Sequence, residues 1–196
     1  MADIKTRARD NARWFDPDSY NTMWNGRAEA AAALQNGARW VCDIGCGMQA
    51  LKAFLKDAIY LPADLNRWTD DTETCDLNAG IYPERALKRA ELCYLLGVVE
   101  YLYHPEKAIG HIALKADRLV VTYNPVDLID PDRTQNPAWQ NAYSTDSFVT
   151  MIESCGFRIN SVDPVGETQI IVSASSQKVS PMQKGRRLLA RLWRPS

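Results

Sequence analysis

The sequence predicts an α/β fold, in which a doubly wound, mostly parallel sheet of seven strands carries helices on both faces and ends in a reversed strand. Three observations lead to this prediction. Short apolar segments typical of buried strands alternate with helix-forming segments, a pattern that produces parallel strands joined by right-handed crossovers. The alternation stops near residue 156, where two strand-like segments follow each other across a short turn. The chain of 196 residues is long enough for one such domain and too short for two typical ones.

The expected elements begin with AEAAAAL (28–34), a strong helix former that ends near Asn36-Gly37, a pair typical of a helix C-terminus. A buried strand at 39–44 then leads through a glycine turn into an amphipathic helix at 48–56. The later strands are expected at 58–64, 72–78, 90–97, 117–125, 157–165 and 168–175. Two further helices are expected at 104–116 and 144–155.

Composition bounds the class of protein. Hydrophobic residues make up 46% and charged residues 24% of the chain, as in an ordinary soluble globular protein. No apolar run approaches the roughly 18 residues of a membrane span, and the first residues lack the apolar core of a secretory signal. The five cysteines are scattered along the chain, which favours free thiols over a disulfide framework. We therefore expect a cytoplasmic protein.

The chain divides into three expected parts: a helical N-terminal cap (1–37), the sheet domain (38–175) and a basic amphipathic tail (176–196). Six of the 23 basic residues follow Glu167, the last acid, which leaves 17 basic against 24 acidic residues in the rest of the chain. From Ser180 on, apolar and basic residues fall on opposite faces of an expected helix. This pattern is typical of a helix that lies on an anionic membrane, here the inner face of the cell membrane, or that docks on a partner protein.

The segment VCDIGCGMQA (41–50) reads as a buried strand, a glycine turn and the start of a helix, the form of a nucleotide-binding loop. Gly45, Gly47 and Ala50 satisfy a relaxed dinucleotide fingerprint, which NAD-dependent enzymes also fit. Asp43, however, would repel a pyrophosphate held by the N–H groups of the turn. It favours a cofactor with an ammonium and a sulfonium but no phosphate, such as S-adenosylmethionine (SAM). The alternative is that its carboxylate only accepts backbone N–H bonds in the turn.

These features resemble, in this order, the class I SAM-dependent methyltransferases, a family with a Rossmann-like fold, over roughly residues 38–174. DIGCG (43–47) is similar to the first motif, which surrounds the methionine part of the cofactor. LLGVVEYLYHPEKAI (95–109) is similar to the fourth motif, whose first residues line the cofactor and in which Glu100 starts the following segment. Gln49 departs from the pattern, because a third glycine often stands at that place. The resemblance implies that the cofactor is bound by Asp43, Gly45, Cys46, Gly47, Asp64, Leu65, Asp76, Leu77, Leu96 and Gly97.

Asp64 and Asp76 extend the resemblance. In the family, an acid after the second strand binds the ribose hydroxyls, and an acid with an apolar neighbour after the third strand lies against adenine. Either acid alone is equally well explained as an N-cap for the next helix. Together with Asp43, they are three acids after three successive strands, and the carboxyl ends of parallel strands meet at one edge of a sheet. Tyr20, in the expected cap, is a further candidate that could close over the cofactor or pack on the sheet.

Methyl transfer to an acceptor is an in-line attack on the sulfonium methyl, so the protein mainly aligns the reactants and excludes water. Four residues are candidates for a base toward a hydroxyl acceptor, in no firm order: His104, Tyr123, Asp127 and Tyr143. Three of them belong to a long loop (123–144) whose carboxylates and aromatic rings suit an acceptor rich in hydroxyls. The plainer interpretation is that the loop and His104 are structural.

We therefore expect an enzyme that methylates a hydroxyl of a small molecule, or of a sugar or glycan precursor. Two alternatives stay open: a non-catalytic SAM-binding or scaffold protein, and an NAD(P)-dependent oxidoreductase. The sheet domain has no basic stripe, so no nucleic-acid partner is expected. No cluster of His, Cys, Asp and Glu has the spacing of a metal site. No NPPY-like motif follows the fourth strand, which disfavours methylation of adenine or of glutamine amides.

Overall fold

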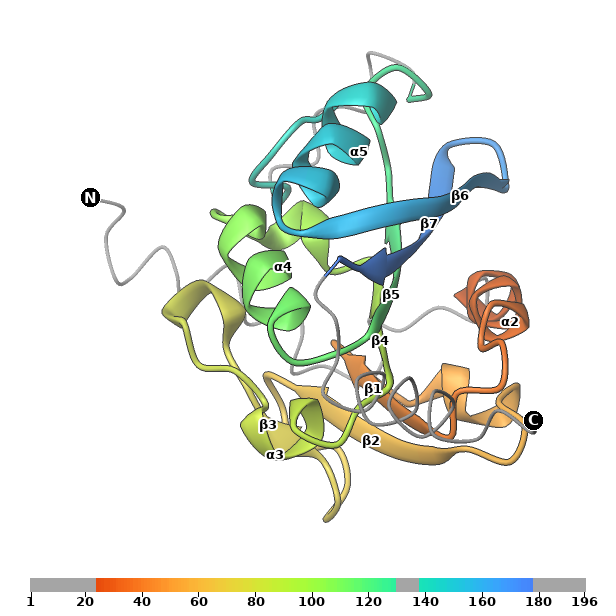
Figure 1. Cartoon of the computed structure of the whole chain (residues 1–196), viewed down its shortest axis with the longest axis vertical. Coiled ribbons are helices and arrows are strands. Elements are labelled where there is room, and N and C mark those ends of the chain that lie inside the picture. The colour runs from red at the N-terminus through yellow and green to blue at the C-terminus, as the bar shows by residue number, and fades with distance from the viewer. Residues whose placement is uncertain (1–23, 130–137, 178–196) are drawn as a thin grey trace, which may run out of the picture.

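A computed structural model of the chain describes residues 24–129 and 138–177 (Figure 1). Seven strands form one sheet in the order β3-β2-β1-β4-β5-β7-β6. The strands are β1 (Trp40–Ile44), β2 (Ile59–Asp64), β3 (Glu73–Thr74), β4 (Leu92–Leu96), β5 (Arg118–Tyr123), β6 (Phe157–Val165) and β7 (Gln169–Ser176). The α-helices are α2 (Trp24–Ala33), α3 (Glu84–Leu87), α4 (Pro105–Ala113) and α5 (Thr145–Ser154). Three short 3₁₀ helices are η3 (Ala50–Ala53), η4 (Leu77–Ala79) and η5 (Val99–Tyr101).

The pairing of the strands confirms the predicted fold class. β1 pairs in parallel with β2 and β4, β2 with β3, and β4 with β5. β7 is the reversed final strand, antiparallel to both β5 and β6. β6 therefore runs in the same direction as β1 to β5. The turn between β6 and β7 consequently lies at the same edge of the sheet as the carboxyl ends of the parallel strands.

Helices cover both faces of the sheet, and each face has its own core. On one face, α3, α4 and α5 pack against β1, β4, β5 and β7 around buried residues such as Ile109, Ile112 and Phe148 (Figure 1). On the other face, α2 and η3 pack against the same central strands, chiefly through alanines of α2 and through Leu51. Because both faces are covered, β4 is buried along its whole length, as the run of apolar residues in its sequence requires.

Backbone conformation explains where the elements end. Asn36 and Gly37 both have positive φ, 45° and 72°, so the expected helix C-terminus lies where the sequence indicates it. The Ser144 hydroxyl accepts a hydrogen bond from the Ser147 N–H and caps α5, and Gly156, with φ of 96°, ends it. β4 is shorter than the expected 90–97, since it stops before Gly97, where φ is 70°.

Two expectations about local structure are wrong, and one helix was not expected. The amphipathic helix expected at 48–56 is only the single turn η3, because Gln49 and Asp57, with φ of 60° and 49°, bend the backbone at both of its ends. The strand expected at 72–78 is shortened to the two residues of β3, since Asp76 leaves the sheet to cap η4. Helix α3 was not expected, because four residues are too few to show helical periodicity.

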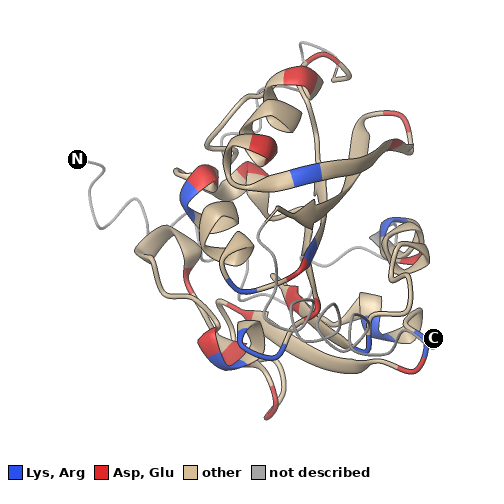
Figure 2. Cartoon of the chain, viewed as in Figure 1, with Lys and Arg blue, Asp and Glu red and all other residues tan. Residues whose placement is uncertain are grey.

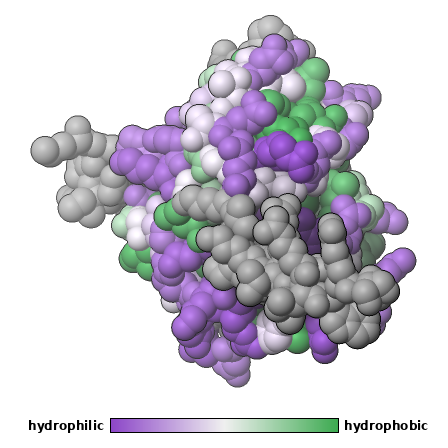
Figure 3. All heavy atoms as spheres, viewed as in Figure 1, coloured by the Kyte–Doolittle hydropathy of each residue, from purple (hydrophilic) through white to green (hydrophobic). Residues whose placement is uncertain are grey.

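Tyr20 and the tail from residue 178 on lie outside the described residues, and the division into cap, sheet domain and tail stays a prediction. No helix within 24–129 and 138–177 has the length and apolar character needed to cross a membrane. Acidic and basic residues are mixed along the described ribbon (Figure 2). On the face shown in Figure 3, hydrophilic residues interrupt the apolar areas of the described surface.

Candidate active site

A cleft of about 1300 Å³ opens at the carboxyl edge of the sheet. It is centred where the chain order changes direction, since β2 lies on one side of β1 and β4 on the other. In open α/β sheets, ligands bind at such a switch point. The walls come from the loops after β1, β2, β3 and β4, from α2 and from the β6–β7 turn. The volume exceeds the roughly 300–1000 Å³ typical of a pocket for one small ligand.

The cleft brings together the cofactor-binding residues predicted within the described part of the chain. Those that line it are Asp43, Gly45, Cys46, Gly47, Asp64, Leu65, Asp76, Leu77, Leu96 and Gly97. They come from four separate loops, so only the fold makes them neighbours. Their shared location is an observation, while their contacts with a cofactor stay a prediction.

Two glycines allow the chain segments around the cleft to approach closely. Gly45, with φ of 77°, lies against Val98, and a Cβ placed on Gly45 would overlap the Val98 side chain. Gly97, with φ of 70°, lies against Arg27, and a Cβ there would overlap the guanidinium group. Backbone conformation therefore disfavours larger residues at both positions, and lack of space does so at Gly45, whereas at Gly97 the end of the Arg27 side chain can move aside.

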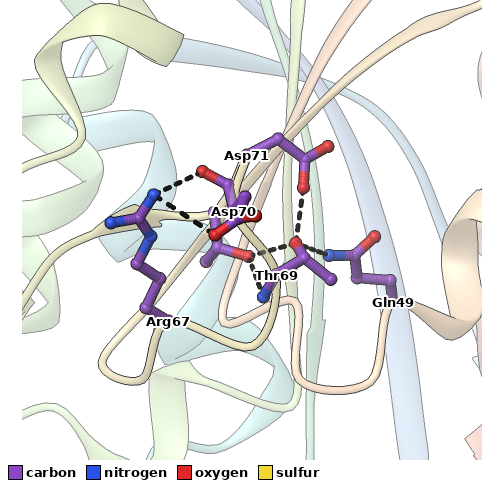
Figure 4. A network of polar contacts seen from close by, with 6 residues as sticks. Gln49, Arg67, Thr69, Asp70 and Asp71 are labelled. Carbon is purple, nitrogen blue, oxygen red and sulfur yellow. Dashed lines mark hydrogen bonds and ion pairs between the residues drawn. The ribbon is translucent and has the colours of Figure 1, made fainter.

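Gln49 replaces the expected third glycine without changing the role of the position. Its φ of 60° is in the left-handed region, which glycine adopts most easily. Its side chain donates a hydrogen bond to the Thr69 hydroxyl at 2.8 Å, and Thr69 donates in turn to Asp71 (Figure 4). The glutamine thus ties the loop after β1 to the loop after β2.

Asp43, in β1 just before the glycine loop, has a strongly shifted pKa. Its side chain is buried and accepts a hydrogen bond of 2.6 Å from the Tyr60 hydroxyl. Burial raises the pKa of Asp43 to about 7, while the bond from Tyr60 and the charge of Arg27 oppose the rise. Asp43 therefore changes its charge near neutral pH.

The other two predicted acids shape the loops as well as line the cleft. Asp64 accepts hydrogen bonds from the N–H groups of Gly47 at 2.8 Å and of Asn66 at 3.1 Å, which fixes the glycine loop to the end of β2. Asp76 caps η4 by accepting from the N–H groups of Asn78 and Ala79. The capping interpretation is right for Asp76, whereas no helix follows Asp64 before β3 and its carboxylate instead joins two loops. Asp76 keeps lone pairs for a ligand, because a carboxylate accepts about four hydrogen bonds.

Arg27, Glu100 and Asn124 form a polar group at the β4–β5 end of the cleft that was absent from the predicted site. Glu100 is 1% exposed, and its Oε1 accepts hydrogen bonds from the Asn124 backbone N–H at 3.0 Å and side-chain amide at 2.7 Å. Its Oε2 has no hydrogen-bond partner among the described residues. Burial raises the pKa of Glu100, against the bonds from Asn124 and the charge of Arg27. Burial likewise lowers the pKa of Arg27, against the charges of Glu100 and Asp43.

Two of the predicted bases, His104 and Tyr123, make contacts that explain them without a catalytic role. The His104 side chain is 62% exposed, and its Nδ1 lies 3.4 Å from a carboxylate oxygen of Glu106. Tyr123 is fully buried, stacks on Phe148 at 4.2 Å and donates a hydrogen bond of 2.7 Å to Asn141. Burial raises the pKa of Tyr123 to about 12, which holds its proton in place.

The other two predicted bases shape the long loop. The Asp127 carboxylate accepts from the Thr145 N–H at 2.8 Å and so attaches the loop to α5. Tyr143 packs edge-on against Tyr123, and its N–H donates to the Tyr123 hydroxyl. None of the four predicted bases lines the cleft formed by the described residues, so geometry gives their catalytic role no support. From the same loop, Trp139 does line it.

Metal-assisted chemistry has no candidate centre in the described ranges, where no three His, Cys, Asp or Glu residues are grouped as metal ligands. The four fully buried cysteines, which include Cys46, are free thiols. Burial raises the pKa of Cys46, so the thiol stays protonated and acts as a small apolar wall of the cleft.

The sequence matches no known family profile and no curated protein. Solved structures match the whole arrangement instead. The mitomycin 7-O-methyltransferase MmcR superposes with a TM-score of 0.63 at 18% identity, over 88% of this chain and 58% of that one. Human N-acetylserotonin methyltransferase in complex with SAM superposes with a TM-score of 0.62 at 16% identity, over 86% of this chain and 57% of that one. Magnesium protoporphyrin IX methyltransferase from Synechocystis PCC 6803, with bound SAM, superposes with a TM-score of 0.60 at 17% identity, over 90% of this chain and 98% of that one.

The fold is that of the SAM-dependent methyltransferases. At these identities the likeness establishes fold and not activity. The chain spans less than two thirds of the first two structures and nearly all of the third.

Proposed function

We propose that the chain is a SAM-dependent methyltransferase that methylates a hydroxyl of a small molecule, or of a sugar or glycan precursor. One observation carries this proposal: Asp43, Asp64 and Asp76, from the ends of three parallel strands, line one cleft together with Gly45 and Gly97. A ligand that spans this cleft meets carboxylates along its length. An amino acid joined to a ribose and a base suits such a surface, because it presents N–H and O–H donors.

The charges of the cleft suit SAM better than a dinucleotide. SAM carries an ammonium, a sulfonium and a carboxylate, and the charged groups near the switch point are three buried acids, Asp43, Asp64 and Glu100, and the half-buried Arg27. In our proposal, Arg27 binds the carboxylate and Asp43 faces the ammonium. A pyrophosphate in the glycine loop would instead lie beside Asp43, which disfavours an NAD(P)-dependent oxidoreductase.

The size of the cleft favours an enzyme over a scaffold that only binds the cofactor. The volume beyond one small ligand is the space that an acceptor needs. Tyr101 and Trp139 add aromatic surface at the β4–β5 end, and Asn124 adds an amide. In the transfer, an acceptor oxygen attacks the methyl carbon in line, the carbon–sulfur bond breaks, and its electron pair stays on sulfur. The protein contributes alignment and exclusion of water.

A small acceptor is also consistent with the described ribbon, along which acidic and basic residues are mixed (Figure 2). For the tail, which lies outside the described residues, the sequence pattern supports a contact with an anionic membrane or with a partner protein. We expect deletion of residues 180–196 to abolish sedimentation with anionic vesicles and to leave cofactor affinity unchanged. If the full chain does not sediment with such vesicles, the membrane contact is excluded.

The proposal is tested by calorimetric titration with S-adenosylhomocysteine (SAH), with NADH as the control ligand. We expect binding of SAH in the micromolar range and none of NADH. Binding of NADH alone would overturn the cofactor assignment. Turnover of SAM against a panel of hydroxyl acceptors then separates an enzyme from a scaffold, because a scaffold binds SAH but turns over no acceptor.

A further inference from the structure

The carboxylate of Glu100 is incompletely satisfied in the described structure. The residue is 1% exposed and lines the cleft, yet Oε2 has no hydrogen-bond partner among the described residues. A buried anionic oxygen without a donor is costly, and native proteins rarely keep one unless a ligand or a water supplies the missing donor. Glu100 therefore indicates that a donor hydrogen, from a ligand or from a water, lies beside Oε2.

The rest of the side chain is held in place. Asn124, just after β5, donates two hydrogen bonds to Oε1, and the Gln140 N–H donates to the Glu100 carbonyl at 2.7 Å. These contacts fix both the backbone and one oxygen, so the orientation of the second oxygen is determined by the protein. Such preorganisation is typical of groups that act on a substrate.

The location of Glu100 assigns it to the acceptor rather than to the nucleoside of the cofactor. The sheet order places β3 and β2, with Asp76 and Asp64, on one side of β1, and β4 and β5, with Glu100 and Asn124, on the other. If the cofactor extends from the glycine loop toward Asp64 and Asp76, its adenosine occupies the first side. The part of the β4–β5 end beyond Arg27, which Asn124 and Trp139 line, is left for the second reactant.

We propose that Oε2 of Glu100 receives the donor hydrogen of the methyl acceptor and takes its proton during transfer; this inference rests on the proposed methyltransferase function. The acceptor oxygen forms a bond to the methyl carbon as the carbon–sulfur bond breaks, and the sulfonium becomes the neutral thioether of SAH. The acceptor proton moves to Glu100 and then to solvent when the products leave. Charge and atoms balance without a further reactant. Burial raises the pKa of Glu100, and the charge of Arg27 acts against that rise and so favours the carboxylate that accepts the proton.

The test uses a ligand that brings a donor to the reacting position without any acceptor. Sinefungin is the SAH analogue in which an amino-bearing carbon replaces the sulfur, so its ammonium lies where the transferred methyl lies in SAM. Calorimetry compares sinefungin with SAH on the wild type, on Glu100→Gln and on the matched control Glu106→Gln. The control makes the same chemical change at an exposed position on α4.

We expect the wild type and Glu106→Gln to bind sinefungin at least tenfold more tightly than SAH, the factor that a charge-assisted hydrogen bond supplies. In Glu100→Gln the ratio should fall to about one while SAH affinity changes by less than threefold. An unchanged ratio in Glu100→Gln, or no preference in the wild type, would overturn the inference. If Glu100→Gln does not fold, Glu100→Asp is used instead. The aspartate side chain is one methylene shorter, so its carboxylate lies farther from the ligand. Absence of binding by both ligands to the wild type would refute the proposed function itself.

Discussion

The two ends of the cleft differ in how the chain builds them. At the β1–β3 end, each acid stands at or near the end of its strand: Asp64 is the last residue of β2, and Asp76 follows β3 after Cys75. At the β4–β5 end, Arg27 comes from α2, Glu100 from η5 and Asn124 from the start of the long loop, and packing alone brings them together. Strand ends are visible in a sequence, whereas convergence of distant segments is not. The polar residues of the first end could therefore be predicted from the sequence, whereas those of the second end were found only in the structure.

The largest expected effect breaks the glycine loop at the predictable end. Gly45→Ala places a Cβ against Val98 at a position with φ of 77°, so we expect SAH affinity to fall by more than about 100-fold and the melting temperature to fall by several degrees. Calorimetry and thermal unfolding measure the two effects. Gly110→Ala is the control: it lies in α4 with no atom near its Cβ, and should stabilise the protein by about 0.5–1 kcal/mol. Equal effects of the two substitutions would contradict the close packing at Gly45.

The next effect concerns Asp43 and has a pH signature. Because its pKa is raised to about 7, the carboxyl is neutral below that pH and anionic above it. If the anion pairs with the ammonium of SAH, affinity should rise with pH and level off above about 7, with a loss of about tenfold per pH unit below it. Asp43→Asn should bind SAH at least tenfold more weakly at pH 8 and lose this dependence.

Other groups act on the same carboxyl, and the titration must account for them. Those with an electrostatic effect on Asp43, or affected by it, are Arg27, Cys42, Cys46, Tyr60, Asp64 and Tyr94. Calorimetry from pH 5.5 to about 8.5 in two buffers of different ionisation enthalpy counts the protons released on binding. An affinity that is flat across this range in the wild type would remove Asp43 from the ammonium site.

A smaller effect sharpens the contrast between the ends. Arg27→Met should weaken SAH by about tenfold and leave methylthioadenosine, which lacks the amino acid, within about twofold of its wild-type affinity. Arg39→Met, just before β1 at the opposite edge of the sheet, is the matched control and should change neither. If Arg27→Met weakens the affinities for SAH and for methylthioadenosine equally, the arginine shapes the cleft and does not bind the carboxylate.

The smallest effect is expected at His104, the most obvious base in the sequence. Its exposed ring pairs with Glu106 and does not line the cleft, so His104→Ala should change SAH affinity by less than about twofold. With an acceptor identified from the panel, turnover should be equally insensitive. A loss of turnover of about tenfold or more would return His104 to the candidate bases and weaken the assignment of Glu100.

The sequence predicted the sheet, its reversed last strand and the acids of one cleft edge, because each depends on local patterns that repeat along the chain. β6 and β7 were recognisable from two strand segments across Gly166-Glu167, and Asp43 from its distance to a glycine turn. Arg27 could not be found in this way, since an arginine in an alanine-rich helix has no distinguishing neighbours. Glu100 was visible as part of a motif, but its unpaired oxygen depends on the burial that α2 and the β5 end create.

Local errors had a similar origin. The apolar spacing of 48–56 is helical, yet the positive φ angles of Gln49 and Asp57 limit the segment to η3. Glycine usually marks such angles in a sequence, and here two polar residues adopt them. Tyr123 is one of four candidate bases from the sequence, and the aromatic packing against Phe148 of α5 that buries its ring is not visible there.

The alanine face of α2 has a consequence for how the cleft opens. Ala28, Ala31 and Ala32 are its buried contacts with the sheet, and each contributes only a methyl group, worth about 0.8 kcal/mol. A helix held so weakly is expected to detach at a lower free energy than the rest of the domain, in a local unfolding event. Arg27 would leave with it, exposing the switch point to solvent. Amide hydrogen exchange should therefore be faster in α2 than in β4, and ligand binding should slow the exchange in α2 most.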